Sequence, residues 1–452
     1  MKMNFFKAAL RRFITLNWLC TFVIAISFCS MQTIANDSLR FRSNTFNNPT
    51  ALPVTVEQLT YAASLKLPTT VASSPIVNDG IAFIAAENGN LYAIELETMA
   101  IKWIFVAQEA LSSTPAIADG QLFVLSMDGH LYALDIAHGT VNWSFKTGGE
   151  QRFAAPRLYG VTQTDQPVTD PWDFWLSSPL VANDTVFFGS SDNRVYALAT
   201  SNGKLKWSFK TGGVVHSSPA LTDNILLIGS WDGALYALEA DSGKEKWRYQ
   251  TETEQEFSTW LGIQSSPVVD GNTVFLGSRD GYLYSIQLEN GTLNWRYDVK
   301  RSWVVPTPLV DEHQIYFGTS DTGQFIALNK QTGEEKWRID TKVWTYSSPL
   351  HSDNAVMVGN MAGNFYVINK KDGQILTKIR SRGAEENRFG AIAKSTGRFD
   401  YKGMATSGWY NNLYSSMQRI LHSGGFLSSP LWYQDKLILV TTDGELMVYA
   451  VK

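Results

Sequence analysis

The chain has 452 residues, with 38 Lys and Arg against 42 Asp and Glu, and a formal net charge of −4. This acidic balance disfavours nucleic acid as a partner, because phosphate binding needs a basic face. The two cysteines, Cys20 and Cys29, both lie in the first 35 residues. A mature chain without those residues would therefore rely on no disulfide.

Residues 1–35 have the pattern of a secretory signal peptide: a basic start, an apolar stretch over 13–28, and T-I-A at 33–35. An uncleaved anchor is the alternative. Removal of this segment, which has four basic residues and no acidic one, would leave a net charge of −8. Phe28 precedes Cys29, where bacterial lipidation needs a small residue, so we expect no lipid anchor at Cys29. Later apolar runs are too short to span a membrane, so we expect a periplasmic or secreted protein.

Residues 36–56 are polar and unpatterned, and we interpret them as a flexible leader. From residue 57 to 452 the chain is built of about eight copies of one unit, best seen in 217–247, which begins S-S-P and ends in tryptophan. The copies are marked by Pro75, Pro115, Pro179, Pro219, Pro267, Pro308, Pro349 and Pro430. A period of about 40 residues is typical of a solenoid, a propeller or an array.

Short apolar runs of period two, separated by turn glycines, predict four antiparallel strands per copy. Four such strands form one propeller blade. We therefore predict an all-β fold, an eight-bladed β-propeller of four-stranded antiparallel blades. The eighth copy stops at Lys452, after its third strand, and residues 59–67 precede the first copy at the spacing of a fourth strand. We expect this N-terminal strand to close the ring, which removes the open edge.

A second turn glycine leads into the fourth strand, and a tryptophan follows it by four residues in five copies. The first copy has a tryptophan at the same place without the glycine. A glycine lets a large flat ring approach closely, so we expect the tryptophans to pack blade against blade. We interpret them as structural residues: Trp103, Trp143, Trp207, Trp247, Trp295 and Trp337.

Segments 133–143 (A-L-D-I-A-H-G-T-V-N-W), 237–247 and 327–337 resemble the tryptophan-docking motif of the quinoprotein-type (PQQ-like repeat) β-propellers. The resemblance covers nearly all of 57–452 and is greater to the outer-membrane assembly propellers than to the quinone-dependent dehydrogenases. For the dehydrogenases it implies a vicinal cysteine pair under the cofactor and a calcium ion held by Glu, Asn and Asp. The mature chain has no cysteine, and no such ligand set can be placed by motif.

Three additions interrupt the period, at about 149–175, 252–263 and 379–426. Each joins the fourth strand of one blade to the first strand of the next, so we expect all three on one face, around the channel mouth. The third has apolar residues at helical spacing, which predicts a short helix ended by Gly424. These residues are Tyr410, Leu413, Tyr414, Met417, Ile420 and Leu421.

The same face collects aromatic and charged residues from the segments before the repeat prolines and from the additions. We predict ligand or partner binding at this mouth by Trp175, His216, Trp260, Arg301, Trp303, Trp344, Tyr346 and Arg388. Further candidates there are Arg152, Arg157, Trp172, Asp173, Glu256, Gln264, Val305, Arg398 and Trp409. Aromatic walls with a few charges suit a pocket, but they would equally serve as a cover. His216 is a lone loop histidine, and Arg301 is either an anion clamp or a solvated side chain.

The expected function is that of an exported, non-catalytic binding platform. We expect a monomeric propeller that binds an envelope protein or a small ligand on its decorated face, the face that carries the three additions. We expect no cofactor and no metal. The alternative is a PQQ-dependent dehydrogenase, which would need the quinone and calcium. A hydrolase or lyase using Glu256 or Asp173 is a third interpretation, although the sequence has no G-x-S-x-G, P-loop or zinc motif.

Overall fold

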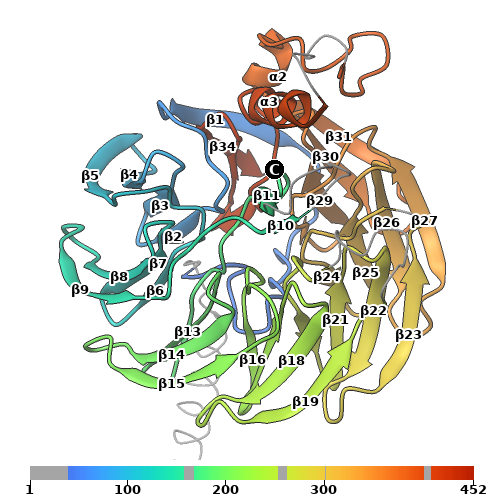
Figure 1. Cartoon of the computed structure of the whole chain (residues 1–452). Helices are drawn as coiled ribbons and strands as arrows, with labels where there is room; N and C mark the ends of the chain where they lie inside the picture. The colour runs from blue at the N-terminus through green and yellow to red at the C-terminus, as the bar shows by residue number, and fades with distance from the viewer. Residues whose placement is uncertain (1–38, 157–166, 253–261, 301, 402–408, 452) are drawn as a thin grey trace, which may run out of the picture. The chain divides into compact units, whose positions relative to one another are not determined.

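The computed structural model describes residues 39–156, 167–252, 262–300, 302–401 and 409–451, of which 409–412 are described in backbone only. Eight four-stranded antiparallel sheets form a ring of blades around a central channel, as predicted (Figure 1). Within the described ranges, neither helix is long or apolar enough to span a bilayer.

Seven blades take all four strands from one repeat, ordered from the innermost strand to the outermost. Blade 1 consists of β2 (Ile76–Asn78), β3 (Ile81–Ala85), β4 (Asn90–Glu95) and β5 (Ala100–Val106). Blade 2 consists of β6 (Ala116–Ala118), β7 (Gln121–Leu125), β8 (His130–Asp135) and β9 (Val141–Lys146). Blade 3 consists of β12 (Leu180–Ala182), β13 (Thr185–Ser190), β14 (Arg194–Ala199) and β15 (Leu205–Lys210). Blades 4 and 5 are β16 (Ala220–Thr222), β17 (Ile225–Gly229), β18 (Ala234–Glu239) and β19 (Glu245–Gln250); β20 (Val268–Asp270), β21 (Thr273–Gly277), β22 (Tyr282–Gln287) and β23 (Leu293–Asp298). Blades 6 and 7 are β24 (Leu309–Val310), β25 (Gln314–Gly318), β26 (Gln324–Asn329) and β27 (Glu335–Asp340); β28 (Leu350–His351), β29 (Ala355–Gly359), β30 (Asn364–Asn369) and β31 (Ile375–Arg380).

The eighth blade joins the two ends of the repeat region. It consists of β32 (Leu431–Tyr433), β33 (Lys436–Val440), β34 (Glu445–Val451) and, as its outer strand, β1 (Leu59–Lys66). β1 pairs antiparallel with β34 from Leu59 opposite Val451 to Lys66 opposite Glu445. The predicted closure of the ring by an N-terminal strand is therefore confirmed.

Tryptophan of one blade lies against glycine of the next at six blade interfaces. A β-carbon on Gly139 would lie 2.5 Å from Cε3 of Trp103, so only glycine fits. The same contact joins Trp143 to Gly203, Trp207 to Gly243, Trp247 to Gly291, Trp295 to Gly333 and Trp337 to Gly373. Each indole N–H also donates to a backbone carbonyl of that next blade, as Trp207 does to Ala240 at 2.8 Å. This paired contact explains the repeated spacing of glycine and tryptophan.

A ring of hydrogen bonds around the axis explains the S-S-P motif. At six of the eight junctions between blades, the amide of the second serine or threonine donates to the hydroxyl of its counterpart in the next blade at 2.9–3.0 Å. These bonds run from Ser74 to Thr114, Thr114 to Ser178, Ser178 to Ser218, Ser218 to Ser266, Thr307 to Ser348 and Ser429 to Ser74. The inner strands are thus joined edge to edge at their start.

The first and third additions converge on one face. The first contains a hairpin that we did not predict, β10 (Ala154–Pro156) and β11 (Pro167–Thr169), and the third contains α2 (Arg382–Glu386) and the predicted helix, α3 (Trp409–Leu421). Side chains of both additions share one apolar cluster with inner-strand residues, in which Phe174, Met417 and Ile420 are buried. Gly424, with φ of +72°, follows α3 by three residues. The second addition falls mostly in 253–261, outside the described residues.

Residues 39–56, expected to be a flexible leader, have a defined place in the structure. Arg42 is buried and donates to the carbonyls of Pro308 and Pro349, and Asn47 donates to those of Pro219 and Pro267. Backbone amides of four inner strands also bond to the leader: three reach its carbonyls, and a fourth reaches the Asn48 side chain. The leader therefore crosses the channel by satisfying inner-strand polar groups that face the axis.

Candidate functional site

The mouth of the channel is covered by the described parts of the first addition, residues 150–156 and 167–175, which we call the cap. In Figure 1 its strands β10 and β11 lie over the middle of the ring. In blades 4 to 7, residues that precede the serine motif contact the cap, namely His216, Gln264, Trp303 and Trp344. The carbonyls of the repeat prolines in the same blades bond to the leader. The cap and the leader therefore lie at opposite ends of the serine ring.

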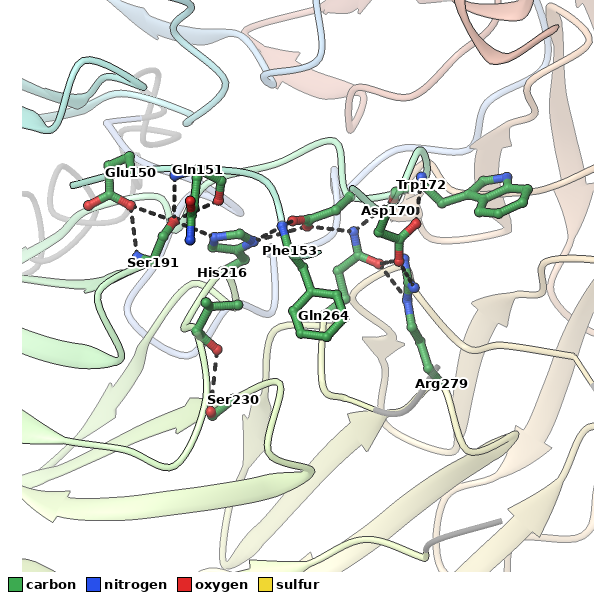
Figure 2. Close-up of polar contacts among 12 residues, drawn as sticks. Glu150, Gln151, Phe153, Asp170, Trp172, Ser191, His216, Ser230, Gln264 and Arg279 are labelled. Atoms are coloured by element: carbon green, nitrogen blue, oxygen red, sulfur yellow. Dashed lines mark hydrogen bonds and ion pairs between the residues drawn. The ribbon is translucent and has the colours of Figure 1, made fainter. Parts of the chain in front are cut away.

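A chain of buried polar groups attaches the cap to blades 3 and 4 (Figure 2). Nδ1 of His216 lies 2.9 Å from Oδ2 of Asp173 in the cap, and Nε2 lies 2.8 Å from Oγ of Ser191. Ser191 Oγ donates to Glu150 Oε2 at 2.9 Å, and Glu150 also accepts from Ser190 Oγ at 2.6 Å. His216 thus links two carboxylates of the cap, one directly and one through a serine.

The protonation of His216 follows from its surroundings. Burial alone would lower its pKa, but the charge and hydrogen bond of Asp173, with the charge of Glu150, outweigh burial and raise the pKa above its usual value. Burial raises the pKa of Glu150, against the hydrogen bonds from Ser190 and Ser191. A protonated His216 donates from both ring nitrogens, which fits an acceptor at Asp173 and a hydroxyl oxygen at Ser191.

Ser191, His216 and Asp173 stand in the order and spacing of a Ser-His-Asp triad. The Ser191 hydroxyl is nevertheless enclosed: besides Glu150, its oxygen lies 2.9 Å from the carbonyl of Gln151 and accepts from the Gln151 amide at 3.1 Å. Ser191 is also only 5% exposed. Because a nucleophile needs room for a carbonyl carbon beside its oxygen, this serine is suited to holding the cap and not to attack.

Arg279 of blade 5 holds the other end of the cap. Its guanidinium forms an ion pair with Asp170, and both side chains are almost completely buried. Nε and Nη2 also donate to Oε1 of Gln264 at 3.0 and 2.8 Å. The guanidinium carbon lies 4.4 Å from the ring centre of Trp231 and 4.2 Å from that of Trp303. The charge is therefore both paired and placed over two indole faces, an arrangement that favours a buried cation.

An aromatic cluster fills the space beside these charges. Trp344 and Tyr346 are stacked at 5.8 Å and 13°, and the cap residue Trp172 meets Trp344 edge-on at 6.1 Å. Phe399 of the third addition lies 4.5 Å from Trp344. Side chains of two additions and of blade 7 thus pack into one apolar layer over the channel.

Below this layer lies a small cavity on the axis. It has a volume of about 40 Å³ and is lined by hydroxyls of the serine ring, by His216 and Tyr346 on one side, and by Phe41 of the leader on the other. A space of this size has room for roughly three water molecules.

The structure brings most of the predicted mouth residues together. His216, Trp303, Trp344 and Tyr346 are buried under or within the cap contacts, and the half-buried Trp175 donates to the carbonyl of Ala72 at 3.0 Å. Arg388 is exposed on the third addition. Of the other candidates, Gln264, Val305 and Asp173 are buried, Arg152 and Trp172 are half-buried, and Arg398 is exposed. Arg157, Glu256, Trp260, Arg301 and the side chain of Trp409 lie outside the described residues.

Four residues that hold the cap share one turn position and were not singled out in the sequence. Ser191 and Arg279 bind it as described, Trp231 stacks on Phe153 at 4.0 Å, and Glu87 lies 3.6 Å from Arg152. All four occupy the turn between the second and third strands, one position before the repeated Asp or its equivalent. The residue at this position differs in character from blade to blade, while its neighbours repeat. This variable position between repeated neighbours was the sequence signal that could have identified the four residues.

Comparison with known proteins identifies the family of this chain. Residues 57–162, 162–316 and 281–452 match the family model described as outer membrane protein assembly factor BamB. The chain belongs to this family. No match was found among curated protein sequences.

Solved structures of two kinds share the fold. BamB from Moraxella catarrhalis is 17% identical, with a TM-score of 0.62, over 87% of this chain and 98% of that one. Quinohemoprotein alcohol dehydrogenase from Comamonas testosteroni is 13% identical, with a TM-score of 0.67, over 93% and 81%. A europium-containing methanol dehydrogenase is 14% identical, with a TM-score of 0.66, over 92% and 98%. Such low identities establish the fold alone.

The described residues of the channel mouth do not fit a quinone. A flat anionic cofactor needs a free aromatic face, but a face of Trp303 is taken by Arg279, and Trp344 and Tyr346 are stacked on each other. The guanidinium of Arg279 is already paired with Asp170. Among the described residues, no three His, Cys, Asp or Glu side chains are grouped so that they could hold a metal ion. The residues that would have to receive the cofactor are bound to the chain itself.

Proposed function

We propose that this protein is an exported, non-catalytic member of its family that binds another protein of the outer-membrane assembly machinery through the decorated face. The observation that carries the proposal is that the chain's own cap occupies the channel mouth. The buried aromatic residues there support the cap, so a partner is left with the outer surface of the additions.

That outer surface offers suitable contact groups on the third addition. Phe389 and Tyr401 are 36% and 47% exposed, so part of each aromatic ring is open to a partner. The guanidinium of Arg388 lies 5.6 Å from the ring centre of Phe389. Aromatic and arginine side chains dominate the energy of many protein interfaces, so we assign the partner contact to these three residues.

Site-specific photocrosslinking in intact envelopes tests the proposal. A photoreactive phenylalanine analogue at position 389 or 401 should yield a crosslinked product that contains a component of the outer-membrane assembly machinery. The matched control is Ser242, which is exposed in a turn between third and fourth strands, at the opposite end of its blade. Equal capture from position 242 would contradict the assignment. Alcohol-dependent dye reduction by purified protein with quinone and calcium would instead support the dehydrogenase.

A further inference from the structure

The seam between the closing blade and blade 1 lacks the tryptophan contact of the six interfaces described above. Ala63 stands ten residues before Ser73, as Trp207 stands ten before Ser217. On the side of blade 1, Met99 takes the place of the glycine. Its amide donates to the backbone carbonyl of Glu95, as the amide of Gly139 donates to that of Asp135, both at 2.8 Å. Met99 has φ of +57°, the left-handed conformation of the turn glycines. Both members of the contact are thus replaced together.

One wall of this seam is apolar and exposed. Ile101, Ile104 and Val106 of the outer strand β5 are 42%, 45% and 67% exposed. Ile104 lies opposite Tyr92 and Ile101 opposite Ile94 on β4. Tyr92 and Ile94 pack in one cluster with side chains of the closing blade. Because opposite residues of paired strands share a face, these β5 side chains face the seam.

Two of these positions, those of Ile104 and Val106, are polar in the other blades with a docking tryptophan. One residue after the tryptophan, where blade 1 has Ile104, the others have Ser144, Ser208, Arg248, Arg296 and Arg338. Three residues after it, where blade 1 has Val106, they have Lys146, Lys210, Gln250, Asp298 and Asp340. Charged side chains on an outer strand prevent unwanted pairing with another chain. In β5 the one charged residue, Lys102, is engaged with Glu95 at 3.4 Å.

We propose that the β5 edge and the seam beside it bind an extended segment of a partner protein, which adds as a fifth strand outside β5 with apolar side chains at alternate positions. β5 is the last strand of its sheet, so its outer backbone groups are available to an added strand within the described part of the chain. Only an extended backbone matches such an edge. Its side chains would lie beside Ile104 and Val106, which recur with the strand period of two.

This site is on the rim and is independent of the partner contact proposed for Phe389 and Tyr401. A strand that pairs with all seven residues of β5 would be roughly 23 Å long. A segment of that length with alternating apolar residues is therefore the ligand class that the edge selects.

A defined peptide tests the proposal on the full chain. The probe is a fluorescent ten-residue peptide that alternates valine and threonine and ends in lysines. We expect saturable binding by anisotropy to the wild type, and at least tenfold weaker binding to I104S/V106K, which carries the residues that β9 and β15 have at these positions. The control L205E removes an exposed apolar residue from another outer strand, where β19 has Glu245, and should bind like the wild type.

Two further measurements separate the possible outcomes. A peptide with the same side chains and N-methyl groups on alternate amides should bind at least tenfold more weakly, because its backbone cannot pair with β5. Equal binding of the methylated peptide, or of I104S/V106K, would overturn the proposal. A photoreactive residue at position 106 that crosslinks two copies of this chain, with no peptide capture, would also overturn it and assign the edge to self-association.

Discussion

At the decorated end of the channel the cap is held by buried charges, whereas at the other end the leader is held mainly by bonds to backbone groups. Asp170, Asp173 and Glu150 of the cap meet Arg279, His216 and two serines. On the leader, Arg42 and Asn47 instead donate to carbonyls of the repeat prolines.

This difference follows from what each segment contacts. The cap meets turn side chains, whose chemistry varies from blade to blade, so its attachment is specific to particular blades. The leader meets backbone groups that recur in the blades, so it needs only donors and acceptors at suitable intervals. Loss of one cap partner therefore leaves a buried charge, while loss of one leader partner leaves unpaired carbonyls.

Removing the Arg279 charge should have the largest effect. In Arg279→Met, Asp170 stays buried without its partner, and we expect the free energy of unfolding to fall by about 3–5 kcal/mol, measured by urea unfolding at pH 7. Arg279→Met with Asp170→Asn should lose less, because the isolated charge is gone.

The control for this prediction is Lys206→Met, which removes an ion pair with the 80% exposed side chain of Asp184. Exposed pairs contribute less than about 1 kcal/mol. A loss for Arg279→Met no greater than that for Lys206→Met would show that the cap is not held by its charges.

Removing Arg42 should have a smaller effect, confined to the leader end. In Arg42→Met the carbonyls of Pro308 and Pro349 lose their donor, and unpaired buried acceptors cost about 1–3 kcal/mol. We expect faster proteolysis within residues 39–56 and an unchanged cap. Arg40→Met is the matched control, since Arg40 donates to one carbonyl, that of Val181, and is only half-buried. Equal protection of the leader in both variants would contradict its anchoring by Arg42.

The repeated sequence pattern determined how much of the fold and of the candidate site could be predicted from the sequence. The blades, the closure by β1 and the helix α3 were predicted, because period-two and helical apolar patterns report burial directly. The place of the leader across the channel was not predicted, because its contacts are bonds from Arg42 and Asn47 to backbone groups, which leave no apolar pattern. The cap partners Arg279 and Glu87 were missed because the sequence does not show which turn meets which addition.

Acidification should also loosen the leader end, through His351. Burial, with the nearby charge of Lys370, lowers the pKa of His351 to about 4. Its Nε2 donates to the carbonyl of Pro49 at 3.1 Å, and its Nδ1 accepts from Lys370 at 3.0 Å. The neutral ring is therefore the form that holds the leader.

A base with a depressed folded-state pKa contributes stability that is present above its unfolded pKa, about 6.5, and is lost as the pH falls toward 4. Between pH 7 and pH 5 this amounts to about 2 kcal/mol of unfolding free energy. His351→Gln keeps a donor and an acceptor but does not titrate, so it should lose about 2 kcal/mol less than the wild type over that interval in urea unfolding. Other groups titrate alike in both proteins and cancel in the difference. If the unfolding free energies of the wild type and of His351→Gln changed equally with pH, His351 would not couple the leader to pH. The two ends of the channel would then respond to acid through other groups.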